Sequence, residues 1–187
     1  EFSVGRICAR QAIDKATTKT VTGTDSVVEI LQGDRGEPLW PDGLAGSITH
    51  TPGLVAAAVM RRADCKTCGV GIDVERATRV LSDGAWRHVL SADEETRLSG
   101  VTDPVLRLVL FSAKESLYKA LYPSCGIFFG FEDASLWFDD DAAGRSSGSA
   151  KLRLERDLGD AFRSGQVFTC VWEIDGAWLF TGVIAGF

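Results

Sequence analysis

The feature that most constrains the fold of this chain is a long amphipathic helix predicted between Pro104 and Tyr122. Pro104 is favourable in the first turn of a helix, and Pro123 is expected to end the helix just before itself. Apolar residues recur every three or four positions, which is typical of a helix that covers a hydrophobic core. They are Leu106, Leu110, Ala113, Leu117, Ala120 and Leu121. We therefore expect the rest of the chain to pack around this helix.

Charged side chains interrupt the same helix at residues 111–119 (Phe-Ser-Ala-Lys-Glu-Ser-Leu-Tyr-Lys). Phe111, Glu115 and Lys119 are spaced by four and share one stripe, so a carboxylate and an ammonium group are presented together on a rigid element. This pair is a candidate for chemistry. The alternative is a solvated ion pair that stabilises the helix by about 0.2–0.5 kcal/mol.

A second acidic element occurs at residues 71–75 (Gly-Ile-Asp-Val-Glu), in a predicted strand. Asp73 and Glu75 are two residues apart, so both side chains point to the same face of the strand. Two neighbouring carboxylates repel one another, and a divalent cation such as Mg²⁺ would remove that repulsion. The alternative is a strand with a polar outer face.

The totals exclude several classes of protein. A net charge of -6 and a pI near 5.0 argue against a protein that grips nucleic acid through a basic face. Five cysteines at irregular spacing fit a reducing compartment, and neither a signal peptide nor a long apolar run is present, so we expect a cytoplasmic protein without membrane contact. The chain opens at Glu1 without Met, inside a predicted helix, so we expect residues upstream of it.

Periodicity and turn signals predict an α+β fold. Beyond the long helix, we expect helices at 2–16 and 83–89, a capping box at 91–94 that starts a short helix, and strands at 55–60, 69–75, 131–138, 151–155, 167–174 and 178–185. This order suggests two similar halves, 1–90 and 91–187, each with a helix packed on a mostly antiparallel three-stranded sheet.

Other polar features of the chain have a structural and a functional interpretation. Arg6 and Arg10 lie one turn apart, and either clamp a phosphate or merely face solvent. The turn-rich segment 33–38, which includes Arg35, either contacts a ligand or is a plain loop. His50 either binds a phosphate or satisfies a backbone group.

Two further features carry little functional weight. The pair Cys65 and Cys68 is weak support for a zinc or redox site, because no second ligand pair and no strand-to-helix context accompany it. The acidic run 139–141 is read as a solvated loop.

Taken in order, residues 46–50 (Gly-Ser-Ile-Thr-His), 71–75 and 111–119 resemble the motifs of the 4'-phosphopantetheinyl transferases of the Sfp type, in particular the actinobacterial members. The combination of motifs and spacing is specific, and the resemblance extends over nearly the whole chain. It implies a pseudo-twofold monomer that transfers 4'-phosphopantetheine from coenzyme A to a serine of an apo acyl or peptidyl carrier protein. Adenosine 3',5'-bisphosphate would be released.

The resemblance also implies roles for individual residues. Asp73, Glu75 and Glu115 would hold Mg²⁺, with Mn²⁺ as an alternative, and the catalytic pair would be Glu115 as base and Lys119 as a pyrophosphate contact. The expected coenzyme A contacts are Arg6, Arg35, Gly36, Pro38, Thr49, His50, Lys114 and Lys119. Lys114 is included only for a helix that lies edge-on to the phosphates.

Two positions depart from the family pattern, because Gln32 and Glu37 stand where relatives carry lysine. Contacts to the 3'-phosphate are therefore less well supported than the metal site. The aromatic residues Phe128, Phe129 and Phe131 are candidates for carrier docking, with core packing as the alternative.

Three alternatives compete with this interpretation. The first is the shorter, trimeric type of the same transferase, which the chain length disfavours. The others are a non-catalytic domain that binds coenzyme A or a carrier protein, and a zinc-supported module built on Cys65 and Cys68.

Overall fold

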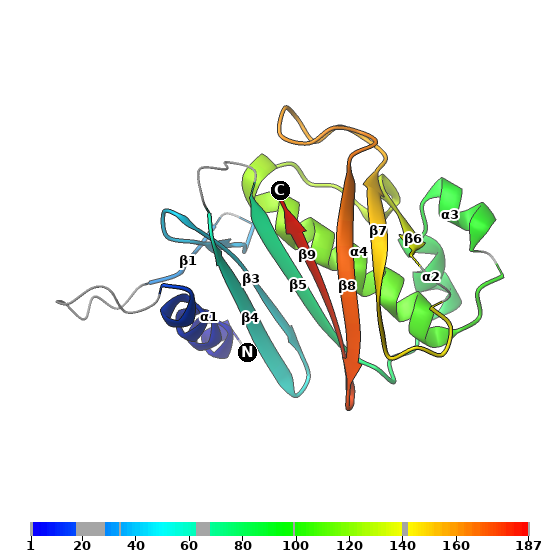
Figure 1. Cartoon of the computed structure of the whole chain (residues 1–187), viewed down its shortest axis with the longest axis horizontal. Helices are drawn as coiled ribbons and strands as arrows, with labels where there is room; N and C mark the ends of the chain where they lie inside the picture. The colour runs from blue at the N-terminus through cyan, green and yellow to red at the C-terminus, as the bar shows by residue number, and fades with distance from the viewer. Residues whose placement is uncertain are drawn as a thin grey trace.

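The computed structural model describes residues 2–17, 29–33, 35–62, 68–98, 100–139 and 142–186. The N-terminal part is a hairpin of β3 (Leu44–Thr51) and β4 (Leu54–Arg61), on which helix α1 (Phe2–Ala16) packs (Figure 1). Apolar residues of α1 and the hairpin share a small core that includes Ala9, Ile13 and Leu44. Between them lie two very short paired strands, β1 (Leu31–Gln32) and β2 (Pro38–Leu39).

The C-terminal part is a five-stranded antiparallel sheet in the order β5-β9-β8-β7-β6. Its strands are β5 (Gly69–Arg76), β6 (Ala134–Phe138), β7 (Ser147–Leu154), β8 (Val167–Asp175) and β9 (Trp178–Ala185). The long helix α4 (Pro104–Cys125) lies across one face of this sheet (Figure 1). The short helices α2 (Asp83–Val89) and α3 (Ala92–Arg97) connect β5 to α4. In the described part of the chain, no helix has the length and apolar character needed to cross a bilayer.

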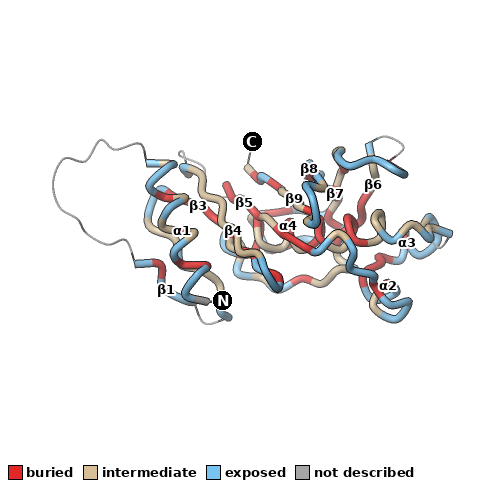
Figure 2. The backbone as a smooth tube through the Cα atoms, turned by 90° about the horizontal axis from the view of Figure 1, so that it is seen from below, coloured by how far each residue is buried: buried red, intermediate tan, exposed pale blue. Residues whose placement is uncertain are grey.

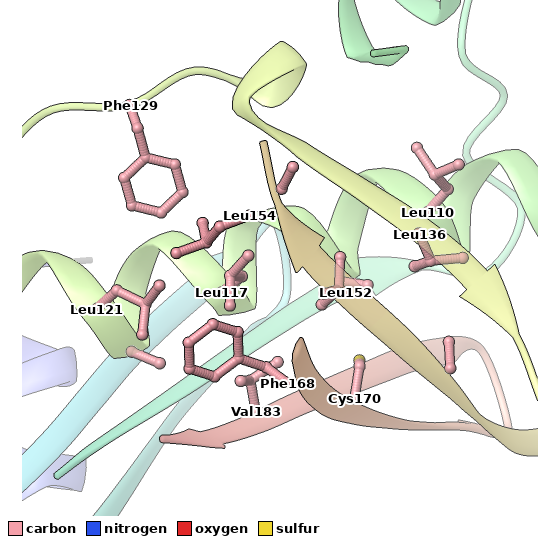
Figure 3. Packing of buried hydrophobic residues seen from close by; sticks show 14 of the residues in the cluster. Leu110, Leu117, Leu121, Phe129, Leu136, Leu152, Leu154, Phe168, Cys170 and Val183 are labelled. Carbon is pink, nitrogen blue, oxygen red and sulfur yellow. The ribbon is translucent and has the colours of Figure 1, made fainter. Parts of the chain in front are cut away.

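The main core lies between α4 and the sheet, as the predicted apolar face requires. Leu110, Leu117 and Leu121 of α4 are fully buried. Figure 3 shows them packed against side chains of the strands, among them Leu152 and Phe168. Figure 2 shows that buried positions follow α4 and the strands it covers, whereas α2 and α3 are mostly exposed. Burial of this kind stabilises by about 25 cal/mol per Å² of apolar surface.

Two glycines of β5 allow α4 to approach the sheet very closely. A Cβ atom at Gly71 would lie 1.8 Å from the carbonyl oxygen of Ser116, and one at Gly69 would lie 2.0 Å from that of Ala120. Any other residue at either position would displace the helix or the strand. These contacts set the depth at which the charged stripe of α4 meets the acidic end of β5.

Side-chain hydroxyl groups join the hairpin to the five-stranded sheet. The Ile72 amide donates to the Ser47 Oγ at 3.1 Å, and the Val74 amide donates to the Thr49 Oγ1 at 3.2 Å. β3 and β5 therefore meet through hydroxyl groups of β3 rather than as paired strands of one sheet. This junction brings Thr49 next to Asp73.

The structure confirms the α+β class and corrects three details of the prediction. Strand β5 belongs to the C-terminal sheet, so the two halves carry unequal sheets and a pseudo-twofold relation is not confirmed. Helix α4 continues through Pro123 to Cys125 and is capped by Gly126, whose φ of 65° is left-handed. Proline is tolerated there because only one bond of the last turn is lost. The segment 131–138 begins as a 3-10 turn (Phe131–Asp133) before it becomes β6.

Candidate active site

The centre of the site is the buried carboxylate of Asp73, which is 6% exposed. Its Oδ1 accepts hydrogen bonds from Lys119 Nζ at 2.7 Å and from Thr49 Oγ1 at 3.0 Å, and its Oδ2 accepts from Ser112 Oγ at 2.8 Å. The three donors come from β3 and α4, so the hairpin, the edge strand β5 and the long helix all converge on one carboxylate. A charged, hydrogen-bonded group of this kind is fixed in one orientation.

Buried hydroxyl groups extend this network beneath the site. Thr181 Oγ1 lies 2.8 Å from Ser112 Oγ and 2.7 Å from Ser116 Oγ, and it also donates to the Ser112 carbonyl at 2.9 Å. Thr181 is the partner of Asp73 in the β5–β9 register. The floor of the site is thus built from the neighbouring strands β5 and β9 together with α4.

Glu75 lies two residues after Asp73 on β5, and it forms an ion pair with Arg79. Its side chain is 11% exposed, whereas that of Arg79 is 43% exposed. The Arg79 guanidinium also stacks on the ring of Phe111, with 4.8 Å from Cζ to the ring centroid. The second predicted carboxylate is therefore neutralised by a nearby surface cation.

Glu115 faces this acidic pair from α4. Burial raises the pKa of its carboxyl group above the usual range, and the Asp73 and Glu75 carboxylates raise it further, while Lys119 and Arg79 lower it. A carboxylate whose pKa is raised toward neutrality is a better proton acceptor near pH 7.

The donor chemistry of the trio suits a hard divalent cation, because all three groups are carboxylates. Among the described residues, however, no three His, Cys, Asp or Glu side chains are arranged as a finished metal cluster. Asp73 is paired with Lys119, and Glu75 is paired with Arg79. Binding of a metal would require these cations to give way.

A cavity of about 260 Å³ opens beside Glu115 and Lys119. The predicted loop contributes Arg35, Gly36 and Pro38 to its wall, which also contains Tyr118 of α4. On the other side of Glu115, a cavity of about 200 Å³ is lined by aromatic residues. They are Tyr118, Phe128, Phe129 and Phe131.

The remaining predicted site residues are placed differently. His50 is exposed near the end of β3, and Arg6 is buried in α1, where desolvation lowers the pKa of its guanidinium group. Neither His50 nor Arg6 is among the described residues that line the cavity beside Glu115. The structure therefore joins Asp73, Lys119 and Thr49 by hydrogen bonds next to the cavity that Glu115 and Lys119 line, and His50 and Arg6 are not among the described lining residues of that cavity.

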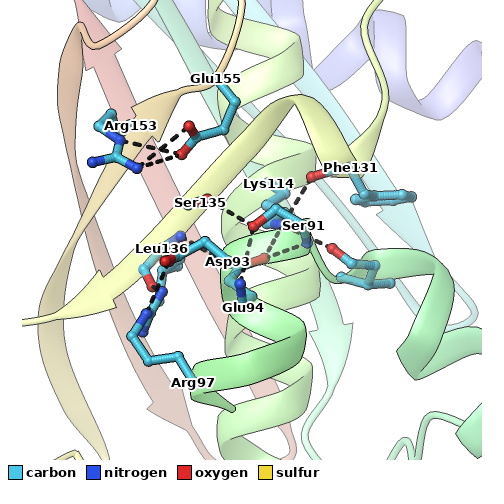
Figure 4. Close-up of polar contacts among 11 residues, drawn as sticks. Ser91, Asp93, Glu94, Arg97, Lys114, Phe131, Ser135, Leu136, Arg153 and Glu155 are labelled. Atoms are coloured by element: carbon cyan, nitrogen blue, oxygen red, sulfur yellow. Dashed lines mark hydrogen bonds and ion pairs between the residues drawn. The ribbon is translucent and has the colours of Figure 1, made fainter. Parts of the chain in front are cut away.

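Lys114 lies in the core, where it is 3% exposed. Figure 4 shows its ammonium group bound to the Glu94 carboxylate, at 2.5 Å, and to the Phe131 carbonyl, at 2.8 Å. The Val89 carbonyl accepts a third bond at 2.7 Å. These three bonds hold the Lys114 ammonium group in the core, so they do not support the predicted phosphate contact of Lys114.

Sequence reasoning missed Ser112, Thr181 and Arg79 as parts of the site. Ser112 could have been found, since it lies four residues before Ser116 and so shares a helix face with it. Thr181 and Arg79 had no comparable signal. Of the cysteine pair, Cys65 lies outside the described residues, and Cys68 is buried with its thiol 3.2 Å from the Gly186 carbonyl. Of the acidic run, only Asp139 is described, and it is exposed.

Known proteins share these sequence features. A family model described as the 4'-phosphopantetheinyl transferase N-terminal domain matches residues 1–60, and one described as the 4'-phosphopantetheinyl transferase superfamily matches residues 69–170. The chain is 39% identical over 146 residues to 4'-phosphopantetheinyl transferase Svp of Streptomyces mobaraensis. The matched region covers 76% of this chain and 55% of that protein.

Two more relatives support the same assignment. The chain is 38% identical over 146 residues to 4'-phosphopantetheinyl transferase PptT of Mycobacterium tuberculosis, covering 77% of this chain and 60% of that protein. It is 34% identical over 182 residues to 4'-phosphopantetheinyl transferase Npt of Nocardia iowensis, covering 96% and 76%. The chain thus matches little more than half the length of the first two relatives. On these matches, the chain belongs to the 4'-phosphopantetheinyl transferase superfamily.

Proposed function

We propose that this chain transfers 4'-phosphopantetheine from coenzyme A to a serine of an apo carrier protein. The observation that carries the proposal is the convergence of Asp73, Lys119 and Thr49 beside Glu115, at the rim of the cavity that includes Arg35 and Pro38. Family membership supports it, since three relatives bear the name of this activity. The cavity adjoins both a proton acceptor and a cation, as transfer of a phosphoryl-linked group requires.

In the proposed reaction, the serine hydroxyl oxygen attacks the phosphorus that carries the pantetheine arm. A new P–O bond forms to serine, the P–O bond within the pyrophosphate breaks, and adenosine 3',5'-bisphosphate leaves with the bridging oxygen. Glu115 takes the serine proton, directly or through a water molecule. Lys119 offsets the negative charge that develops on the leaving phosphate.

Asp73, Glu75 and Glu115 would hold Mg²⁺, or Mn²⁺, in the working enzyme. A bound divalent cation supplies charge neutralisation and polarisation of the pyrophosphate oxygens. The residues of the chain contribute position, because the Ser112 and Thr49 hydroxyls fix Asp73 before any ligand arrives.

The loop residues Arg35, Gly36 and Pro38 are proposed to contact the nucleotide part of coenzyme A, since they line the cavity next to Lys119. Thr49 is proposed to act near the phosphates. Contacts from His50 and Arg6 to the 3'-phosphate stay predictions, because neither lines this cavity among the described residues.

The aromatic cavity on the far side of Glu115 is proposed to receive the carrier protein or the pantetheine arm. Phe128 is 62% exposed and lies against Tyr118, with 5.8 Å between the ring centroids, so aromatic surface is accessible at this cavity. Carriers of fatty-acid, polyketide and nonribosomal-peptide synthases are all compatible. Residues 1–90 as the coenzyme A half, residues 91–187 as the carrier half, a monomeric state and a cytoplasmic location stay predictions.

The test is to incubate the protein with coenzyme A, Mg²⁺ and an apo carrier protein, and to follow the mass of the carrier. We expect a gain of one phosphopantetheine group that is lost in Asp73→Ala and Glu115→Ala. Glu95→Ala, at an exposed glutamate of α3, is the matched control and should keep the activity. Binding of coenzyme A without transfer to any carrier would favour the non-catalytic alternative instead.

A further inference from the structure

Two cations pair with carboxylates of the acidic trio Asp73, Glu75 and Glu115, and the proposed function assigns a role to only one of them. Lys119 pairs with Asp73 and also serves the proposed chemistry. Arg79 pairs with Glu75 but contacts no cavity beside Glu115 among the described residues. It reaches Glu75 because the chain turns directly after β5, where the Arg79 amide donates to the Arg76 carbonyl at 2.8 Å.

Arg79 is held at the surface rather than locked in the core. Its side chain is 43% exposed, and its guanidinium stacks on Phe111 at 4.8 Å. An open cavity of about 290 Å³ adjoins it, lined by Glu75, Arg76, Thr51 and neighbouring residues. The guanidinium group therefore has space into which it can move without disturbing the core.

We infer that Arg79 is an internal counter-ion that competes with a divalent cation for the Glu75 carboxylate. An ion that binds Glu75 must displace the guanidinium or accept its repulsion at short range. Arg79 thereby weakens metal binding in the free protein and neutralises Glu75 until a metal arrives. The inference rests on the proposed function, because it takes Glu75 as a metal ligand.

Arg76 provides a matched control three residues earlier. Its guanidinium also stacks on an aromatic ring, that of Trp178 at 4.7 Å, and it is exposed. Its guanidinium, however, donates to the Pro52 carbonyl at 3.4 Å and not to a carboxylate. Arg76→Gln and Arg79→Gln therefore remove the same charge from the same surface, and only the second removes a partner of Glu75.

The experiment titrates the purified protein with Mn²⁺ alone, without coenzyme A or carrier, and measures free Mn²⁺ by electron paramagnetic resonance. We expect Arg79→Gln to bind Mn²⁺ about fivefold more tightly, the range for losing a half-exposed ion pair. Arg76→Gln should change the affinity by less than about twofold. Arg79→Lys, which retains a cation, should stay near the wild-type value.

Each other outcome overturns the inference in a recognisable way. Equal effects of Arg76→Gln and Arg79→Gln would mean that only general charge matters, and weaker binding in Arg79→Gln would mean that Arg79 orients Glu75 for the metal. The variant Asp73→Asn distinguishes failure of the inference about Arg79 from failure of the proposed metal site. If it abolishes Mn²⁺ binding while Arg79→Gln changes nothing, the inference fails and the proposed site stands. If Mn²⁺ binding persists unchanged in Asp73→Asn, the proposed metal site fails together with the inference.

Discussion

At the scale of single residues, the neighbouring residues Lys114 and Glu115 of α4 lie in different environments. Glu115 stays half-buried at the cavity rim, whereas Lys114 is buried and held by Glu94 and two carbonyl groups. A helix turns by about 100° per residue, so adjacent residues cannot share an environment. The motif therefore supplies Glu115, the residue proposed for chemistry, and Lys114, which anchors the helix.

The buried pair of Lys114 and Glu94 predicts a large effect on stability. Glu94 is also bound by the Ser91 and Leu136 amides, so its removal leaves a buried ammonium group and two amides without their acceptor. We expect Glu94→Ala to lower the free energy of unfolding by about 3–5 kcal/mol. Urea denaturation measures this, with the exposed Glu95→Ala as control. A loss below about 1 kcal/mol would contradict the importance of the pair.

Cys170 offers a prediction about thiol reactivity. It is fully buried, and burial raises the pKa of its thiol to about 12. Very little of the reactive thiolate is then present at pH 8, so Cys170 should stay unlabelled by iodoacetamide at that pH and react readily in urea. Peptide mass spectrometry reports the site. Labelling of the folded protein at a rate similar to that in urea would contradict the prediction.

At the scale of elements, the contact between α4 and β5 decides the geometry of the site. Gly71 predicts the most specific effect, because a Cβ atom there would meet the Ser116 carbonyl at 1.8 Å. Gly71→Ala should push α4 away from β5, cost about 1–3 kcal/mol of stability or more, and separate Lys119 from Asp73. Thermal denaturation and the carrier assay measure the two consequences.

Gly182 of β9 is the control for this substitution. It pairs with Ile72 of β5, yet a Cβ atom there would lie 3.9 Å from its nearest neighbour, an ordinary contact. Gly182→Ala should therefore leave both stability and activity nearly unchanged. Equal losses in the two variants would show that the close approach of α4 is not the cause.

Element boundaries show how far local patterns reach. The helix at 2–16, the helix at 83–89, the strand at 178–185 and the capping box at Ser91 are confirmed, since each depends on periodicity or on neighbours three residues away. The predicted stop before Pro123 was wrong, because a left-handed glycine at 126 terminates the helix instead. The start of β6 was also misplaced, because the 3-10 turn there depends on an Asp133 carboxylate that binds the Gly130 amide.

At the scale of the whole molecule, two parts of unequal size meet at the β3–β5 junction. We expect Ser47 to contribute to the stability of this junction, because its hydroxyl accepts a hydrogen bond from the Ile72 amide. Ser47→Ala should cost about 0.5–1.5 kcal/mol and raise the hydrogen exchange rate of the Ile72 amide. Exchange measured by NMR tests this, and an unchanged rate would contradict the role of the hydroxyl. Ser149→Ala, at a serine far from the junction that bonds Asp139, serves as control.

The sequence by itself determined the helices, most strands and the candidates for residues that carry chemistry, because periodicity and motif spacing are local properties of the chain. Only the tertiary structure decided which groups face one another. Strand β5 pairs with β9 more than a hundred residues later, and this pairing places Thr181 beneath Asp73 and leaves the hairpin as a separate sheet. The rotation of α4 against the two β5 glycines sends Lys119 to Asp73 and Lys114 into the core. Long-range pairing and close packing depend on surfaces assembled from distant segments, which no local pattern records.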